Sequence, residues 1–593
     1  ETVDSNLGPP QVANFTYLGN GRRVRRDTAG GEIVWKVHNA SGVGLIGLDS
    51  FGRTRLNVYS NAAESSNFYH AQHTYDKVGN LTAQVIQQAY YSGWTAHDRS
   101  RVNTYNLLGQ LTGTKVGLAT WDSTNDRWKI DSGDMTREDT WTLDTLGNWV
   151  GDQSNPGREI TGDLDSGSIG PSAGFWTWGA DGTDDELSFT HGTDMRNRIA
   201  DLLHDFDGQT PTSVMPVYDG AGNLLEDGSY VYEYDAWNRL VQVKRASDGY
   251  LLRHYTYDGL GRLIKTTSPD NFSNRVEHHH YDGTRRVQTV VVSGLMSGGG
   301  AMASGDPAMQ SMAMASEPSG ESTEPENTNM AFTSSQMGAS GQTFVVYREY
   351  VWGPGDHGVD EALVYYDATD EAWWCLTDLT GDLIALCDLG GTNGAARVVA
   401  QWTYDAYGSV MSADHLHSFE RPVIGHKGLF LDRLDLVNPL GPQLVPFAQS
   451  VYHNRNRAYI PQMGRFLQQD PNQSAMSLIA ASPFHGRGAG AIAVAFSLDG
   501  LYGDGANLYQ YLGSNPWMRN DPTGLSWDPF SIVDEYLAED AASKAAFLEK
   551  LVGEFNTVGH VLGQIAQLHP SVGFAVSAVQ LANCQVNLAT VLG

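Results

Sequence analysis

The sequence predicts a mainly β protein in which tandem hairpins form a large, spiralling β-sheet shell, and three observations support this fold class. A turn unit that often begins with Tyr-Asp recurs along much of the 593 residues. The segments beside this unit alternate apolar and polar residues at period two, as strands with one buried face do. The 66 glycines, 27 tyrosines and 15 tryptophans suit strands and tight turns better than helices.

The recurring unit consists of Asp or Asn, two variable residues, Gly or Asn, one further residue and a strand former. The Asp side chain can accept a hydrogen bond from the backbone two residues on, and the fourth position requires the positive φ that Gly and Asn tolerate. Each unit is therefore predicted to be one hairpin. The units are Asp27 to Gly30, Asp49 to Gly52, Tyr75 to Leu81, Tyr105 to Leu111, Asp144 to Trp149, Tyr218 to Leu224, Tyr234 to Leu240, Tyr257 to Leu263 and Tyr404 to Gly408, with a degenerate copy at Tyr281-Asp282.

A lone hairpin cannot bury its apolar face, so successive hairpins are expected to pair edge to edge into one sheet that curls to shield itself. The alternative is a β-propeller or an ordinary solenoid. Adjacent copies are 16 residues (234 minus 218) to 24 residues (281 minus 257) apart. This spacing is about half of the roughly 40–45 residues of a propeller blade, which favours the shell.

The composition limits the functional classes. Asp and Glu outnumber Lys and Arg by 68 to 38, which argues against nucleic-acid binding because the molecule repels phosphate backbones. Three cysteines are too few for a disulfide-rich scaffold. No apolar run reaches the roughly 18 residues of a transmembrane helix, so no membrane span is expected in this chain. The start at Glu1 suggests a cut inside a longer polypeptide whose targeting signal lies upstream.

The repeated Tyr-Asp-x-x-Gly-Asn/Arg-Leu unit resembles the RHS/YD-repeat family, which includes bacterial RHS proteins, a component of insecticidal toxin complexes and the teneurins. Motifs of the same family follow in the family's order toward the C-terminus. They are Trp373 to Gly381, Trp402 to Gly408, Tyr452 to Tyr459, Gly464 to Phe466, Asp470-Pro471, Asn507 to Tyr509, Asn515-Pro516 and Asp521 to Leu525. The resemblance covers most of the chain up to Leu525 and implies a hollow shell that a core domain closes as a plug.

In toxin-bearing members of this family, the segment after the Asp-Pro-x-Gly-Leu motif is a variable effector held inside the shell. There the shell cleaves itself after the Leu with an aspartyl-protease-like pair. For this chain the resemblance implies Asp470 and Asp521 as the catalytic carboxylates, Arg465 nearby, and a scissile bond between Leu525 and Ser526. Two carboxylates that share a site can split their pKa values, so that one acts as acid and the other as base.

Two departures from the family pattern affect this self-cleavage hypothesis. The first motif continues Asp470-Pro471-Asn472-Gln473 instead of Asp-Pro-x-Gly, and an Ala/Gly-rich stretch near 475–503 separates the two halves. The alternative is that both aspartates only cap turns before proline. A glycan hydrolase is not expected either, because the turn aspartates do not form its paired carboxylates. Apart from self-cleavage, no enzymatic activity is expected, and neither is a cofactor or a metal.

The predicted organisation has five parts. YD repeats occupy 1–292 and 343–450, and a Gly/Ser/Met/Pro-rich insertion at 293–342 is expected to be disordered. The core domain is expected at 451–525. The tail, 526–593, has the helical spacing of Leu537, Ala541, Ala545 and Leu548, which predicts short amphipathic helices that form either a plug or the start of an effector.

Cysteines and histidines raise two smaller questions. Cys375 and Cys387 lie at equal distances from Gly381, so they could face each other across a hairpin; free buried thiols are expected, and a disulfide is the alternative. The run His278 to His280 and the pair His415 and His417 suggest zinc, but no Cys or carboxylate ligand at matching spacing supports it. Structural or surface histidines are the expected interpretation.

The function hypothesis is the C-terminal part of a bacterial RHS-repeat protein, secreted or displayed on the cell surface, whose shell encapsulates or presents its own C-terminal segment. That segment, as cargo or plug, is the expected partner. The alternative is a non-catalytic adhesion scaffold of the teneurin type, which would bind another protein or a cell-surface glycan. A large exposed apolar patch would favour adhesion over encapsulation.

Overall fold

The regular structure is almost entirely β, as the sequence predicts. The computed structural model describes residues 2–3, 12–17, 23–37, 47–61, 67–88, 99–151, 157–162, 185–193, 197–206, 212–268, 275–293, 335–337, 343–353, 361–390, 395–415, 423–434, 450–470, 507–521 and 524. Within these ranges the elements are β-strands and three short 3-10 turns, η1 (Ala29–Gly31), η5 (His426–Gly428) and η6 (Leu512–Ser514). No helix in them is long and apolar enough to cross a membrane.

The first large sheet has 14 strands that pair in chain order, each antiparallel to its neighbours, as tandem hairpins require. A separate two-stranded hairpin, β10 (Thr120–Asp122) and β11 (Arg127–Lys129), interrupts the order. The strands of the sheet are β1 (Thr2–Val3), β2 (Ala13–Tyr17), β3 (Arg23–Thr28), β4 (Ile33–Lys36), β5 (Leu56–Asn61), β6 (Asn67–Tyr75), β7 (Leu81–Gln88), β8 (Ser100–Tyr105), β9 (Leu111–Gly117), β12 (Met135–Trp141), β13 (Arg158–Gly162), β14 (Asp185–Thr193), β15 (Ile199–Phe206) and β16 (Thr212–Val214).

The second large sheet has 15 strands and follows the same rule, with the short strand β25 (Ser335–Met337) added beside β26. Strand β24 pairs directly with β26, so the stretch between them connects two neighbouring strands. The remaining strands are β17 (Val217–Tyr218), β18 (Leu224–Glu226), β19 (Tyr230–Tyr234), β20 (Leu240–Arg245), β21 (Leu251–Tyr257), β22 (Leu263–Ser268), β23 (Arg275–Asp282), β24 (Arg285–Ser293), β26 (Thr343–Trp352), β27 (Ala362–Asp367), β28 (Ala372–Thr377), β29 (Leu383–Asp388), β30 (Arg397–Tyr404) and β31 (Val410–His415).

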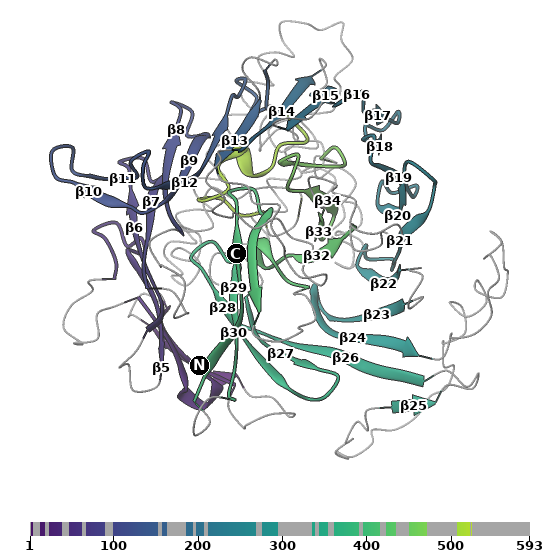
Figure 1. Cartoon of the computed structure of the whole chain (residues 1–593). Helices are drawn as coiled ribbons and strands as arrows, with labels where there is room; N and C mark the ends of the chain where they lie inside the picture. The colour runs from purple at the N-terminus through teal and green to yellow at the C-terminus, as the bar shows by residue number, and fades with distance from the viewer. Residues whose placement is uncertain are drawn as a thin grey trace, which may run out of the picture.

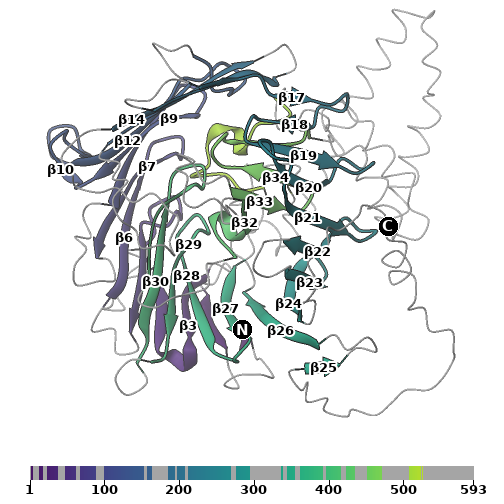
Figure 2. The ribbon, with the colours of Figure 1, turned by 45° about the vertical axis from the view of Figure 1, so that its right-hand side comes forward.

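The two sheets form one curved wall that closes on itself. In Figure 1 the first sheet forms the left and upper wall, and β17–β26 continue it down the right. Strands β27–β30 then return, and Figure 2 shows β28–β30 beside β3. At this closure Val364, Trp374 and Cys387 pack with Ile33 and Tyr59 in one apolar cluster. The predicted spiralling shell is confirmed, because the end of the wall packs on its beginning.

Two buried ion clusters join strands that are far apart in the sequence. Glu361 accepts hydrogen bonds from Arg23 at 2.6 Å and from Arg26 at the closure. Asp405 accepts a hydrogen bond from Arg158 of β13 at 2.6 Å. Arg137 and Asp139 complete this second cluster, and all four side chains are buried. Glu361 and Asp405 are each satisfied by guanidinium groups from the first sheet, as a buried charge requires.

A third, four-stranded sheet lies inside the curve of the wall (Figure 1). Its strands are β32 (Phe430–Arg433), β33 (Ser450–Asn454), β34 (Arg457–Ile460) and β35 (Arg465–Phe466). Val451 and Ile460 pack against Tyr232 of the second sheet. Tyr452 and Tyr459 lie in another cluster with Trp141 of the first sheet. The predicted core plug is therefore held between both sheets.

The turns of the repeats have the predicted chemistry. At Asp258, Oδ1 accepts from the backbone N–H of Leu260 and of Arg262, both at 2.9 Å, and Oδ2 accepts from Arg262 Nε at 2.7 Å. Gly261 has a φ of +81°. The Oδ1 of the first turn residue accepts the same two backbone bonds at Asp49, Asp76, Asn106, Asp144, Asp235, Asp367, Asp378 and Asp405.

The tyrosine before the aspartate links each hairpin to the one before it. The Tyr257 hydroxyl donates to the Leu240 carbonyl at 2.8 Å, and the Tyr281 hydroxyl donates to the Leu263 carbonyl at 2.8 Å. The Arg239 guanidinium also lies 4.9 Å from the centre of the Tyr257 ring. The two side chains of the recurring Tyr-Asp pair therefore form different bonds: the Asp bonds lie within the turn, and the Tyr bond joins two hairpins.

Two of the predicted turns differ from the repeat pattern, and two predicted segments lie largely outside the described residues. Asp27 does not begin a turn of this type, since its carboxylate pairs with Arg25 two residues earlier in β3 at 2.9 Å. The degenerate copy at Asp282 forms a shorter turn, with β24 beginning at Arg285. The predicted helical tail, 526–593, and most of the predicted insertion lie outside the described residues.

Candidate functional site

The candidate site forms where two separate pieces of the core segment meet. The piece at 450–470 is bonded to the piece at 507–521: the Phe466 amide donates to the Tyr509 carbonyl at 3.0 Å, and the Asp470 amide donates to the Leu508 carbonyl at 2.9 Å. Tyr459 and Tyr511 stack with ring centres 3.8 Å apart. The two halves of the predicted core motif are thus brought together in space.

The second piece is held by the turns of the wall. The Asn515 Nδ2 donates to the Asn80 Oδ1 at 2.8 Å and to the Gly109 carbonyl at 2.9 Å, which belong to two successive turns. The Asn507 Nδ2 donates to the Asn148 Oδ1 at 2.9 Å, and the Tyr509 hydroxyl donates to the Gly222 carbonyl at 2.6 Å. Side-chain amides and a hydroxyl from the core therefore recognise the repeat turns directly.

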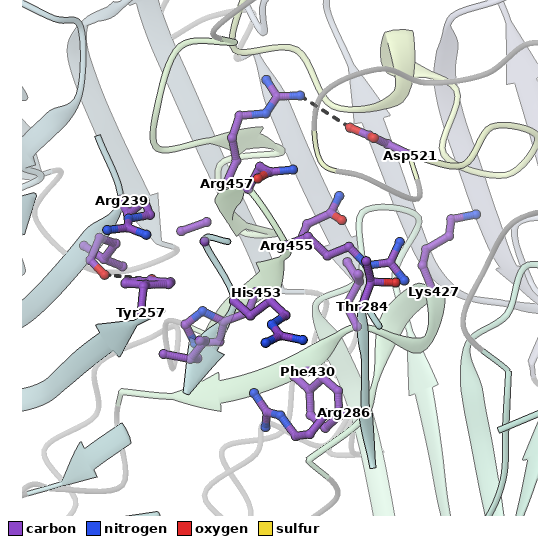
Figure 3. Close-up of a pocket in the computed structure, with 18 of the residues that line it drawn as sticks. Arg239, Tyr257, Thr284, Arg286, Lys427, Phe430, His453, Arg455, Arg457 and Asp521 are labelled. Atoms are coloured by element: carbon purple, nitrogen blue, oxygen red, sulfur yellow. Dashed lines mark hydrogen bonds and ion pairs between the residues drawn. The ribbon is translucent and has the colours of Figure 1, made fainter. Parts of the chain in front are cut away.

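Arg457, at the start of β34, connects the two predicted aspartates. Its Nη2 atom lies 3.2 Å from the Asp470 Oδ2 and 3.4 Å from the Asp521 Oδ2. Its Nε donates to the carbonyl of Gly524, and Phe466 stacks on the guanidinium at 3.6 Å. Figure 3 shows Arg457 reaching toward Asp521. The arrangement is a buried carboxylate–guanidinium–carboxylate group next to the chain that leads to the predicted scissile bond.

The structure brings together Asp470 and Asp521 but places Arg465 elsewhere. The Arg465 guanidinium donates to the Asn148 Oδ1 at 2.8 Å and to the Asn197 carbonyl at 3.0 Å, so it contacts the repeat turns. Arg457 was not among the predicted site residues. Its only signal in the sequence is its place in the run Asn454 to Arg457 inside a core motif. The bond between Leu525 and Ser526 lies outside the described residues.

Cys375 and Cys387 are free and buried, so the expected state is confirmed and the disulfide alternative is wrong. Cys375 lies opposite Leu386, and Cys387 lies opposite Trp374, because the strands do not pair symmetrically about Gly381 but one residue out of that register. The two thiols consequently enter different apolar clusters.

The histidine run has a structural role at its middle residue. His279 is buried, and its ring nitrogens lie 3.0 Å from the Thr266 hydroxyl and 3.3 Å from the Thr289 hydroxyl. Burial lowers the pKa of His279 well below its ordinary value, with Arg286 adding to the shift. In the described parts of the chain, no three His, Cys, Asp or Glu side chains are close enough to hold a metal ion.

The fold and the turns define a class: a β-sheet shell built from tandem Tyr-Asp hairpins. The RHS repeat family model matches residues 234–272, which contain the turns at Asp235 and Asp258. This match confirms the predicted resemblance to the RHS/YD-repeat family and places an RHS repeat at these residues.

No curated protein matches the chain. Among solved structures, it is similar to a Photorhabdus luminescens Tc holotoxin pore, with a TM-score of 0.46, 14% identity and coverage of 87% of this chain and 19% of that one. It is also similar to a crystal structure of TcdB2-TccC3, with a TM-score of 0.42, 13% identity and coverage of 86% and 22%. The chain thus spans about a fifth of the length of these structures.

Proposed function

We propose that this chain is part of an exported RHS-repeat shell that encloses or presents its own C-terminal segment and cleaves itself after Leu525. The observation that carries this proposal is the Arg457 group, in which one guanidinium contacts Asp470, Asp521 and the Gly524 carbonyl. The peptide entering the predicted scissile bond is therefore held beside both carboxylates. The wall that closes on itself and surrounds the core sheet supports the enclosing role.

In this proposal one of the two carboxyl groups, Asp470 or Asp521, acts as the general base and the other as the general acid. A water molecule between them attacks the Leu525 carbonyl. Arg457 is a positioning residue, because it donates hydrogen bonds to the Gly524 carbonyl and to Asp521 and forms an ion pair with Asp470. Arg465 was predicted to lie near the two aspartates. Its contacts with Asn148 and Asn197 suit the docking of the core segment instead.

Intact-protein mass spectrometry of the purified full chain tests the cleavage. Cleavage after Leu525 would remove 68 residues (593 minus 525) from the wild type. We expect Asp470→Asn and Asp521→Asn to remain intact, and Asp248→Asn, which alters an exposed turn aspartate, to be cleaved like the wild type. Arg457→Gln should slow cleavage by about 100-fold or more, the scale of an effect on the alignment of reacting groups.

Two results would contradict the proposal. Cleavage of the two aspartate variants at the wild-type rate would show that these carboxylates are not catalytic. An intact wild type would show that the tail stays attached to the shell, and it would favour the adhesion scaffold over the self-cleaving shell.

One observation favours that second candidate, a recognition scaffold. The third residue of several repeat turns is a large apolar side chain in solvent, with exposed fractions from 38% at Leu146 to 84% at Val78. Since paired strands are about 4.8 Å apart, the tips of successive hairpins are roughly 10 Å apart. Isolated apolar surface residues need no explanation, but these share one position of the repeat. They are Phe51, Val78, Leu108, Leu146, Trp237 and Leu260.

A further inference from the structure

The joint between the two large sheets is crossed by no strand ladder in the described residues. The first sheet ends at β16 and the second begins at β17, and only Met215 and Pro216 separate these strands in the sequence. In Figure 1 the joint lies at the upper right, where β17 follows β16. Within each large sheet, by contrast, neighbouring strands are hydrogen-bonded to one another. The joint is therefore held by other contacts.

The tyrosine of the repeat forms a different bond at this joint. In repeats within a sheet, its hydroxyl donates to the carbonyl of the residue after the preceding turn, as Tyr234 does to Leu224 at 2.8 Å. At the joint, the Tyr218 hydroxyl instead accepts from the Ile199 amide at 3.1 Å. The Arg198 guanidinium also lies 5.5 Å from the centre of the Tyr218 ring. The bond across the joint thus differs from the one that links hairpins within a sheet.

The core segment bonds to both sides of the joint. On the side of the first sheet, the Arg465 guanidinium donates to the Asn148 Oδ1 at 2.8 Å and to the Asn197 carbonyl at 3.0 Å. On the side of the second sheet, the Leu467 carbonyl accepts from the Leu224 amide at 3.0 Å. Arg465 and Leu467 are two residues apart, so one short stretch of the core at β35 spans the joint.

Tyr509, in the second piece of the core segment, adds to this span. Its hydroxyl donates to the Gly222 carbonyl of the second sheet at 2.6 Å. Its backbone carbonyl accepts from the Phe466 amide of β35 at 3.0 Å. Its ring also meets the Tyr218 ring edge to face, with the ring centres 6.0 Å apart. Tyr509 therefore ties the second sheet to the stretch that holds the first.

Apolar packing at the joint also depends on the core. Ile199 of the first sheet and Leu224 of the second lie in one cluster with Met463 and Leu467 of the core segment. All four side chains are buried. Because burial of apolar surface is the main favourable contribution to such a contact, the core segment supplies much of the free energy that holds the two sheets together.

We propose that the wall opens at this joint and that the core segment is the latch that keeps it closed. Strands joined by a ladder separate only when many backbone hydrogen bonds break together, whereas a joint held by a few side chains can open locally at a lower cost in free energy. Separation of β16 from β17 would open the shell from the side without breaking a strand pair. This inference does not depend on self-cleavage after Leu525.

Hydrogen–deuterium exchange of the full chain tests the proposal, because two amides report directly on the joint. The Ile199 amide is bonded across the joint to Tyr218, and the Leu224 amide is bonded to the core. In the wild type, peptides that contain these two amides should exchange together. We expect their exchange to be at least about tenfold faster than that of amides in the ladder between β19 and β20.

A matched pair of variants tests the latch. Tyr509→Phe removes the hydrogen bond to Gly222, and it should raise the exchange of both reporter amides about tenfold, the scale of one lost hydrogen bond. Tyr257→Phe makes the same chemical change within the second sheet, where it removes the bond to Leu240. This control should leave exchange at the joint unchanged.

Three results would overturn the proposal. Exchange of both reporter amides in the wild type no faster than that of the ladder amides would mean that the joint opens only when the sheets unfold, and this comparison needs no variant. Unchanged exchange at the joint in Tyr509→Phe would show that the core segment is not the latch. Equal acceleration in Tyr509→Phe and Tyr257→Phe would show a general loosening of the wall.

Discussion

At the scale of single residues, the turn at Asp378 shows how one substitution changes the chemistry of a repeated motif. In most repeat turns the fifth residue is Arg, Asn or Gln, which bonds the side chain of the first. Here the fifth residue is Asp382, so two carboxylates share one buried turn. His426 Nδ1 lies 2.9 Å from Asp382 Oδ1, and the pKa of Asp382 is lowered despite its burial, with His426 and Lys427 as the causes. Of the two carboxylates in this turn, the charged form of Asp378 is therefore the less favourable.

Burial and the neighbouring Asp382 raise the pKa of Asp378 to about 6. A raised carboxyl pKa means that the folded protein binds the proton more tightly than the unfolded chain does. Asp378 therefore lowers stability as pH rises from about 4 to 6, and the full penalty is present above pH 6. We expect Asp378→Asn to stabilise the protein at pH 7.5 by at most about 3 kcal/mol, and to have little effect at pH 4. Thermal melting at the two pH values measures the difference.

Asn106 supports this expectation, because Asn at the same turn position accepts both backbone bonds, at 2.9 and 3.0 Å. The matched control is Asp258→Asn, which removes the ion pair with Arg262 in a partly exposed turn. That control should destabilise the protein slightly, by up to about 1 kcal/mol at pH 7.5. A loss of stability in both variants at pH 7.5 would show that Asp378 is not a strained charge.

At the scale of elements, the repeat turns serve as a docking surface for the core segment as well as hairpin ends. Glycine at the fourth turn position leaves room for this contact: a Cβ on Gly147 would lie 1.8 Å from the Gln510 Nε2, and one on Gly222 would lie 2.6 Å from Gln469. At Gly261 the core segment is farther away, and the nearest atom, Asn456 Oδ1, would be 4.0 Å from a Cβ. Glycine at the fourth position therefore meets a backbone requirement of the turn, and it has a packing role only where the core segment lies close.

Asn515 is the strongest test of this docking, because it donates to two turns at once. We expect Asn515→Ala to weaken the attachment of 507–521 by about 2–3 kcal/mol, since it leaves buried acceptors unpaired. Limited trypsin digestion should then cut at Arg519 faster than in the wild type. Asn125→Ala, in the exposed β10–β11 turn, is the control and should not change this rate. An unchanged cleavage rate in Asn515→Ala would mean that apolar packing alone holds the segment.

At the scale of the whole molecule, closure joins strands separated by more than 300 residues. Arg26 of β3 and Glu361 beside β27 are 335 residues apart, and the Tyr59 hydroxyl donates to the Thr377 carbonyl at 2.9 Å across 318 residues. Such contacts cost much chain entropy, so they form only when apolar surface is buried with them. The cluster around Trp374 supplies that surface.

Glu361→Gln should open this closure. The substitution leaves Arg23 and Arg26 without their carboxylate in a buried site, for which the expected cost is about 3–5 kcal/mol. The first thermal unfolding transition should move to lower temperature. Glu233→Gln, which alters the solvent-exposed pair with Lys244, should shift it by much less. Equal shifts in the two variants would show that the ion cluster does not hold the closure.

The candidate site was predictable in part. Asp470 and Asp521 could be named because each stands in a short motif, and the structure places both against one guanidinium. Arg457 could not be distinguished from Arg465 by sequence, since both are motif arginines close to Asp470 in the chain. Which of them meets the carboxylates depends on the path of β34 and β35 through the core sheet.

The sequence by itself determined the class of fold, because the turn that defines it is local: the carboxylate, the positive-φ glycine and the bonded amides lie within five residues. Period-two alternation then implied the strands on either side. Only the tertiary structure decided how the wall closes, that the strand register keeps Cys375 from facing Cys387, and that Arg457 meets Asp470 and Asp521. These features depend on contacts between residues far apart in the chain, and local spacing carries no information about which distant side chains will meet.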